Sequence, residues 1–127
     1  MIKFLKLIFY FSTFLLIAVS LYPGSLIGYL LYSDLSKEIE LVQNPIGTSI
    51  NHFIYYFYLT ILGSFIYVRS DNFKKMTLVL FFLSFILEIS HLIVPNRAFQ
   101  LYDLISNFLG VLVAYFLVKL YLNFKML

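Results

Sequence analysis

The chain has 127 residues, of which 62% are hydrophobic and 12% are charged, and its formal net charge is +3. A soluble domain is about 45–50% apolar and about 25% charged, and a chain this small cannot bury so much apolar surface in one aqueous core, so the composition indicates an integral membrane protein. The absence of cysteine excludes disulfides, thiolate metal sites and cysteine nucleophiles, and the absence of a basic stripe argues against a nucleic-acid partner.

Four segments are apolar and long enough to be membrane-spanning helices, which need about 20 residues. They run over residues 4–22, 52–68, 76–94 and 102–122. Pro23-Gly24 ends the first segment, and a short helix over residues 35–42 is expected at the membrane interface in the polar stretch that follows. The sequence therefore predicts an all-α, four-helix membrane bundle that forms a single domain over residues 1–127.

The positive charges predict the orientation of this bundle. With four spans, seven of the nine Lys and Arg residues fall on the side that holds both termini and the 69–75 turn. Cytoplasmic loops carry the excess of Lys and Arg, so both termini are expected in the cytoplasm. Residues 1–20 also resemble a signal peptide, but their apolar run of about 19 residues is longer than the usual 7–15, which favours a retained helix.

Polar side chains gather at the predicted outer ends of these helices. They are His52, Glu88, His91, Arg97, Asp103 and Asn107. Glu88 and His91 share a helical face at i,i+3 spacing, as Asp103 and Asn107 do at i,i+4. A carboxylate at the bilayer centre costs about 2.5–3.5 kcal/mol, so these groups are expected to form one inward-facing polar cluster, with Arg97 paired to Glu88 or Asp103.

Small residues on the fourth span predict a close helix–helix contact. Gly110 and Ala114 form a small-xxx-small pair on the face of Asp103 and Asn107, and such pairs let another helix approach closely. The third span, joined to the fourth by a short connection that begins at Pro95, is the expected partner.

These residues resemble the pattern of the VanZ-like family of small membrane proteins, over roughly residues 15–115. "HFIYY" supplies His52, Phe53 and Tyr56 of the family's His-Phe-x-x-Tyr stretch, and "SLYP" at residues 20–23 resembles the end of its first helix. The family's second stretch is matched at equal spacing by Glu88, Pro95, Arg97, Asp103, Asn107 and Gly110. Two places depart from the pattern: His91 stands where the family has Gln, and Thr48-Ser49 stand where Asp-Lys is frequent.

The resemblance implies a bacterial inner-membrane protein of the cell envelope, since the family is named for a member linked to teicoplanin resistance. The expected ligand at an outward-facing polar pocket is a lipid, a lipid-linked precursor or a lipophilic glycopeptide antibiotic. Arg97 would engage an anionic group of that ligand. Asp103, Asn107, His52 and Tyr56 are the further candidate binding residues. Apart from this ligand, the lipid bilayer is the expected partner, and no cofactor is expected.

Other functions stay open beside this one. A membrane-embedded hydrolase or transferase would use Glu88 or His91 as general base, although a non-enzymatic role is favoured. A structural subunit of a membrane complex would use the same groups to lock the helix ends, with Asp103 as a helix N-cap. Glu88-x-x-His91 matches half of a di-metal motif, and His52 makes a mononuclear site conceivable, but the motif has no second copy and no metal is expected.

Overall fold

The computed structural model describes residues 1–37 and 49–125, and this part of the chain is helical without strands. The helices are α1 (Ile2–Leu21), α2 (Leu26–Tyr32), α3 (Ser49–Tyr67), α4 (Asn72–Ser90) and α5 (Leu101–Lys125). Each of the four apolar segments of the sequence corresponds to one of the four long helices, with ends that differ by a few residues.

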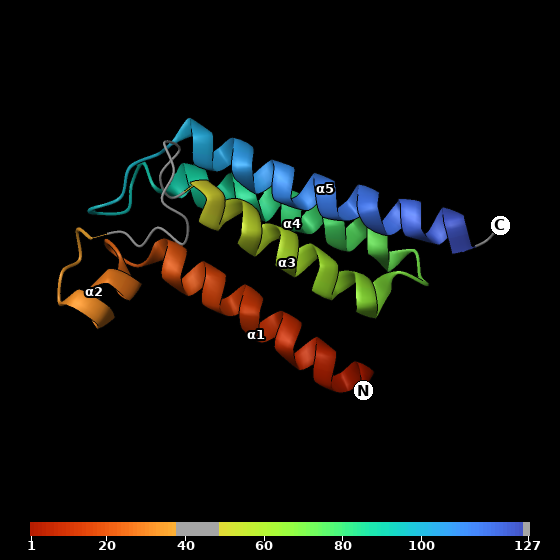
Figure 1. Ribbon diagram of the computed structural model, residues 1–127. Helices are drawn as coiled ribbons and strands as arrows, with labels where there is room; N and C mark the ends of the chain where they lie inside the picture. Colours follow the sequence, from red (N-terminus) through yellow and green to blue (C-terminus); the bar gives the residue numbers. More distant parts are fainter. Residues whose placement is uncertain (38–48, 126–127) are drawn as a thin grey trace.

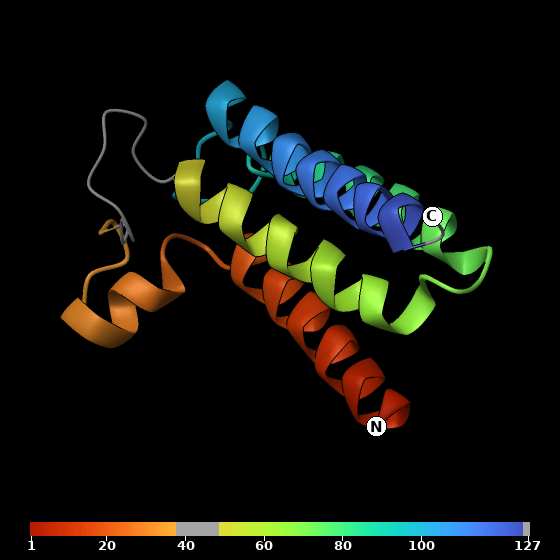
Figure 2. The same ribbon diagram turned by 45° about the vertical axis from the view of Figure 1, so that its right-hand side comes forward.

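The long helices run side by side (Figure 1). α3 packs most extensively on α5, α4 packs on both, and α1 lies along α3 and touches α4. Figure 2 shows α1 as the outermost of the four, with α2 projecting beyond its C-terminal end. The start of α1 and the end of α5 lie at the same end of the bundle (Figure 1), and the connection between α4 and α5 lies at the other.

Two of the long helices meet the length and composition needed to cross a membrane. They are α1, over Ile2–Leu21, and α5, over Leu101–Phe124. α3 carries tyrosine and hydroxyl side chains among its apolar residues, and α4 carries the charged residues Lys74, Lys75 and Glu88. The outer faces of all four are apolar: Phe14, Phe65, Val79 and Phe116 are each more than half exposed. Water-soluble monomers rarely expose so much contiguous apolar surface, whereas lipid would cover it.

The short helix α2 was not expected from the sequence. The Ser25 side chain caps it by accepting a hydrogen bond from the Gly28 amide at 3.0 Å. Gly24 has a φ of 78°, which favours glycine, and the Ser25 amide donates to the Leu35 carbonyl at 2.7 Å. Of the helix expected over residues 35–42, Leu35 and Ser36 form a turn and Lys37 is not helical, while the rest lies outside the described residues.

α4 ends four residues earlier than the span predicted over residues 76–94. The amides of residues 91–93 donate to carbonyls three residues earlier, at 3.0–3.2 Å, so the chain tightens into turns after Ser90. Pro95 follows these turns, and Asn96 has a φ of 57°. His91 therefore stands at the helix end, where its side chain can leave the regular helical face.

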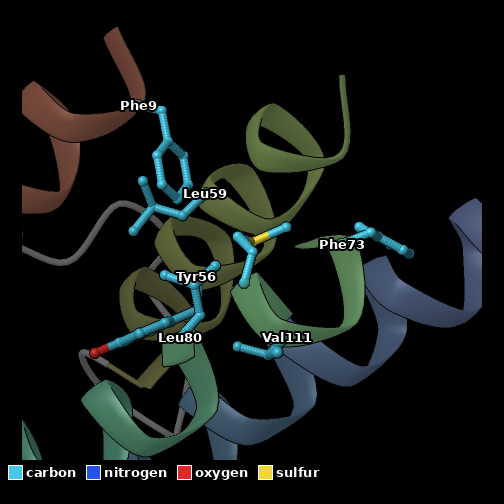
Figure 3. Close-up of a cluster of buried hydrophobic side chains, with 7 residues drawn as sticks. Phe9, Tyr56, Leu59, Phe73, Leu80 and Val111 are labelled. Carbon is cyan, nitrogen blue, oxygen red and sulfur yellow. The ribbon is translucent and has the colours of Figure 1, made fainter. Parts of the chain in front are cut away.

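The interior forms two zones along the bundle. The apolar zone brings together Phe9, Tyr56, Leu59, Phe73, Met76, Leu80 and Val111 (Figure 3). Tyr56, expected as a binding residue, is 2% exposed and belongs to this apolar zone, and it also lines the cavity described below. The polar zone occupies the end where α4 meets the connection to α5.

Gly110 sets the distance between α3 and α5. A Cβ atom there would lie 2.5 Å from the Phe53 carbonyl oxygen and 3.0 Å from the Phe57 amide nitrogen. The sequence predicted that this face would pack on the third span, which is α4. That prediction is wrong for Gly110, which faces α3. Only glycine lets the two backbones approach this closely.

Candidate functional site

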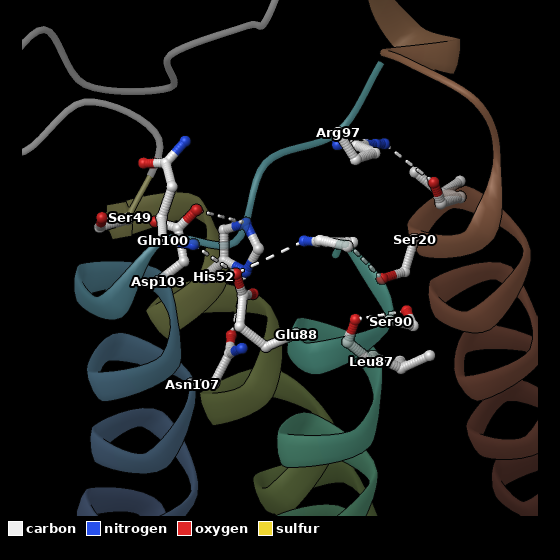
Figure 4. A network of polar contacts seen from close by, with 12 residues as sticks. Ser20, Ser49, His52, Leu87, Glu88, Ser90, Arg97, Gln100, Asp103 and Asn107 are labelled. Atoms are coloured by element: carbon white, nitrogen blue, oxygen red, sulfur yellow. Dashed lines mark hydrogen bonds and ion pairs between the residues drawn. The ribbon is translucent and has the colours of Figure 1, made fainter. Parts of the chain in front are cut away.

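Polar residues from the four long helices and from the connection between α4 and α5 gather at one end of the bundle (Figure 4). Of the predicted residues, Glu88, His91, Asp103 and Asn107 are at most 5% exposed. His52 joins them from the first turn of α3, and Arg97 lies on the connection between α4 and α5. We call this set, with Ser20, Ser49 and Gln100, the polar cluster.

One half of the polar cluster joins α3 to α5. Ser49 donates its hydroxyl to Oδ1 of Asp103 at 2.5 Å, and Nε2 of His52 lies 3.5 Å from Oδ2 of the same carboxylate. The other ring nitrogen of His52, Nδ1, lies 3.1 Å from Oδ1 of Asn107. Asp103 and Asn107 lie one helical turn apart, so both reach His52 from one face of α5.

Asp103 differs from its expected role as a helix N-cap. It is the third residue of α5, within the first turn, and its carboxylate is held by Ser49 of another helix. A negative charge in the first turn is still favourable, because the helix N-terminus carries partial positive charge.

The other half of the polar cluster joins α4 to α1. Oε1 of Glu88 accepts a hydrogen bond from the Gln100 amide at 3.1 Å and lies 3.4 Å from Nδ1 of His91. Nε2 of His91 lies 3.1 Å from the Ser20 hydroxyl, near the end of α1. Ser20, His91 and Glu88 thus form a continuous series of polar contacts across two helices.

Arg97 fastens the connection before α5 to the end of α1. Its guanidinium donates to the Val19 carbonyl at 3.0 Å and to the Tyr22 carbonyl at 3.4 Å. The helical partner of the Val19 carbonyl would be the amide of residue 23, which is Pro23 and has no N–H. Arg97 therefore satisfies a carbonyl that the sequence leaves open, while its expected partners Glu88 and Asp103 are held by other donors.

A cavity of about 320 Å³ opens between α1 and the rest of the bundle, against the polar cluster. Its polar wall comes from Ser20, Asn51, His52, Glu88, His91, Arg97 and Asn107. Its apolar wall includes Leu15, Leu16, Val19, Ile27, Tyr55 and Leu87. One space thus offers both hydrogen-bonding groups and hydrocarbon, which is the pattern of a ligand pocket.

Sequence reasoning missed three members of the polar cluster. Ser20 and Ser49 carry no local signal, because their partners lie 71 and 54 residues away. Gln100 acts through its backbone amide, and every residue except proline has one. Of the predicted structural positions, Pro95 follows the turns after α4, Gly110 contacts α3 in place of the third predicted span, and Ala114 is fully buried.

Residues 4–122 match the family described as VanZ/LLP1. The match spans all four long helices and every member of the polar cluster. No curated protein and no solved structure matches the chain.

Proposed function

The chain belongs to the VanZ/LLP1 family, and from its cavity we propose that it is a multi-pass bacterial inner-membrane protein that recognises an amphipathic envelope ligand at the outer surface. The ligand class is a lipid or lipid-linked precursor. The observation that carries the proposal is a single cavity that is lined on one side by apolar side chains and on the other by the polar cluster.

The proposed orientation places all four long helices across the membrane and both termini in the cytoplasm. Support comes from the basic residues at the end of the bundle that holds the termini: Lys3, Lys6, Arg69, Lys74, Lys75 and Lys119. Positive charge accumulates on cytoplasmic loops, and this end would face inward. The polar cluster and the cavity would then open near the outer surface, with α1 retained as one wall.

The cavity walls favour a ligand with two chemical parts. Leu15, Leu16 and Leu87 offer hydrocarbon contacts to an acyl or isoprenoid chain. Arg97 lies at the polar end of the same cavity, where its guanidinium suits a phosphate or carboxylate. His52 and Asn107 add groups that can hydrogen-bond to hydroxyls or phosphate oxygens.

The cavity volume separates the candidate ligands. A space of about 320 Å³ is at the lower end of small-molecule pockets, which run from about 300 to 1,000 Å³. It accommodates a head group and the start of a chain. A lipophilic glycopeptide would place only its acyl chain there, so a membrane lipid is the better fit.

Native mass spectrometry of the protein purified in mild detergent tests this proposal. Wild-type protein should carry a bound lipid. The Val19→Trp variant should have lost this lipid, because the larger side chain fills the cavity. Leu7→Trp is the matched control, because Leu7 lies on the same helix and is 66% exposed. Equal lipid retention by the two variants would refute a ligand in this cavity.

The contacts among Ser20, His91 and Glu88 favour a second candidate function, that of a membrane-embedded hydrolase. With its proton on Nδ1, His91 donates to Glu88 and its Nε2 accepts from the Ser20 hydroxyl. This is the arrangement of a serine nucleophile, a general base and an orienting carboxylate, and all three line the cavity. Sequence spacing did not suggest it, because the serine comes from another helix.

The corresponding reaction would cleave an acyl ester. The Ser20 oxygen would attack the carbonyl carbon while its proton passes to Nε2 of His91. The alcohol would leave with that proton, and water would hydrolyse the acyl-serine to release the acid and restore Ser20. Arg97, on the same cavity wall, would stabilise the negative charge on the carbonyl oxygen.

A fluorophosphonate probe separates this candidate from simple ligand recognition. An enzyme should acquire one adduct, mapped to Ser20, and Ser20→Ala and His91→Gln should abolish it. Ser12→Ala is the control, because Ser12 is a buried serine of the same helix that contacts Tyr58 instead. A folded wild-type protein that takes up no probe would eliminate the hydrolase.

A further inference from the structure

Glu88 leaves one polar atom without a partner. Within the described part of the chain, Oε2 of Glu88 is the only buried side-chain nitrogen or oxygen without a hydrogen bond, although Glu88 is 1% exposed. An unsatisfied buried carboxylate oxygen is costly, so such an atom calls for a partner that the protein's own side chains do not supply.

Three potential metal-ligand groups converge beside this carboxylate. His52, Glu88 and Asp103 each offer one ligand atom, and these atoms lie within 4.8 Å of one another. Within this group, Nε2 of His52 and Oδ2 of Asp103 are 3.5 Å apart. Two ligands of a tetrahedral ion with bonds of about 2.0–2.2 Å lie about 3.4 Å apart, so this pair already has the required separation.

The remaining atom of each group is held in place by a neighbour. Nδ1 of His52 faces Asn107, Oδ1 of Asp103 accepts from Ser49, and Oε1 of Glu88 accepts from the Gln100 amide. Metal ligands in proteins are oriented in this way by outer hydrogen bonds. These contacts leave Nε2 of His52, Oδ2 of Asp103 and Oε2 of Glu88 as the atoms that an ion could bind.

The His52 ring gives an independent reason for a cation in that space. Since Oδ1 of Asn107 accepts from Nδ1, a neutral ring presents the lone pair of Nε2 to the Asp103 carboxylate. A lone pair facing a carboxylate oxygen is unfavourable unless a cation lies between them. A proton on Nε2 would satisfy Asp103 but would leave Oε2 of Glu88 without a partner, whereas a metal ion satisfies both.

We propose that His52, Glu88 and Asp103 bind one divalent metal ion of the zinc type beside the cavity. Imidazole and carboxylate together suit Zn²⁺, and three protein ligands leave a fourth position for water or a ligand oxygen. This revises the expectation of no metal, which rested on the Glu88-x-x-His91 half-motif. His91 is replaced in the ligand set by Asp103, which no spacing rule links to His52.

The test measures metal on detergent-purified protein that has been stripped with a chelator, dialysed and supplied with Zn²⁺. Elemental analysis should find one ion per chain, and calorimetry should show saturable binding. His52→Ala, Glu88→Gln and Asp103→Asn should each abolish stoichiometric binding. Asp71→Asn makes the same chemical change at an exposed acid outside the cluster, and it should bind as wild type does.

An outer-sphere variant keeps the proposal testable if a ligand variant fails to fold. Asn107→Ala should lower Zn²⁺ affinity by about 10- to 100-fold, because it releases the His52 ring. Wild-type protein that retains no more Zn²⁺ than Asp103→Asn would overturn the site, as would unchanged binding by folded His52→Ala. The assay contains no added lipid, so its failure would leave the ligand test untouched.

Discussion

The hydroxyl of Ser20 lies 3.1 Å from Nε2 of His91, which joins α1 to the end of α4. His91 in turn lies against the Glu88 carboxylate, so one imidazole connects the outermost helix to the buried acid. In the family pattern this position is a Gln, and an amide can likewise both donate and accept. The histidine keeps the connection and adds a ring that can accept a proton.

Substitution of His91 should separate its structural role from any chemical one. His91→Leu removes a buried hydrogen-bonding group and should destabilise the fold by about 1–3 kcal/mol. His91→Gln should cost clearly less, because an amide can bond Ser20 or Glu88. Thermal unfolding in detergent measures both, with Ser90→Ala as the control, since the Ser90 hydroxyl donates to the Leu87 carbonyl of its own helix. Equal losses for Leu and Gln would contradict the bridging role.

Arg97 should matter for docking α1 as well as for ligand recognition. Arg97→Ala leaves the Val19 and Tyr22 carbonyls without this donor, at a cost of about 1.5–3 kcal/mol for each charged hydrogen bond. Arg97→Lys should recover only part of this stability, because one ammonium group cannot reproduce the forked donors of the guanidinium. Cross-linking between α1 and the connection before α5 reports docking directly. If both variants accumulate normally and complement a deletion phenotype, Arg97 has neither role.

Gly110 should tolerate no side chain. Gly110→Ala places a Cβ 2.5 Å from a backbone oxygen of α3, which cannot move without separating the helices. The expected loss is about 1–3 kcal/mol, as for other overpacked sites. Gly63→Ala is the matched control, because its nearest neighbour is the flexible end of Met76. A larger loss at Gly63 than at Gly110 would show that the contact between α3 and α5 is misassigned.

The proposed orientation predicts the result of reporter fusions. A reporter placed after Ser70 should read cytoplasmic, and one placed after Arg97 should read extracytoplasmic. The reason is the concentration of basic residues at the end that holds the termini. A cytoplasmic reading after Arg97 would reverse the bundle and place the cavity on the inner side.

The four long helices could be predicted from the sequence because apolar runs interrupted by Pro, Gly and charged turns are local signals. The polar cluster could be predicted in part, since Glu88 and His91, and Asp103 and Asn107, are paired by helical spacing. The segment of α2 is only seven residues long, too short for a periodic pattern to distinguish it from a loop.

Contacts between distant segments could not be predicted. Nothing local links Ser20 to His91 or Arg97 to Val19, 78 residues apart. Charge alone favoured a pair between Arg97 and a carboxylate. Arg97 instead donates to the Val19 carbonyl, which has no helical partner because Pro23 lacks an N–H. Gly110 was correctly recognised as a contact point, yet its partner depended on the order of the helices in space.

A photoactivatable phospholipid with a diazirine in its acyl chain tests the central claim most directly. After irradiation in reconstituted membranes, peptide mass spectrometry maps the attached residues. The proposed cavity predicts adducts on Leu16, Tyr55 and Leu87, which are lost when Val19→Trp fills the space. Adducts confined to outward-facing residues such as Phe14 and Phe116, unchanged by Val19→Trp, would contradict lipid recognition in this cavity.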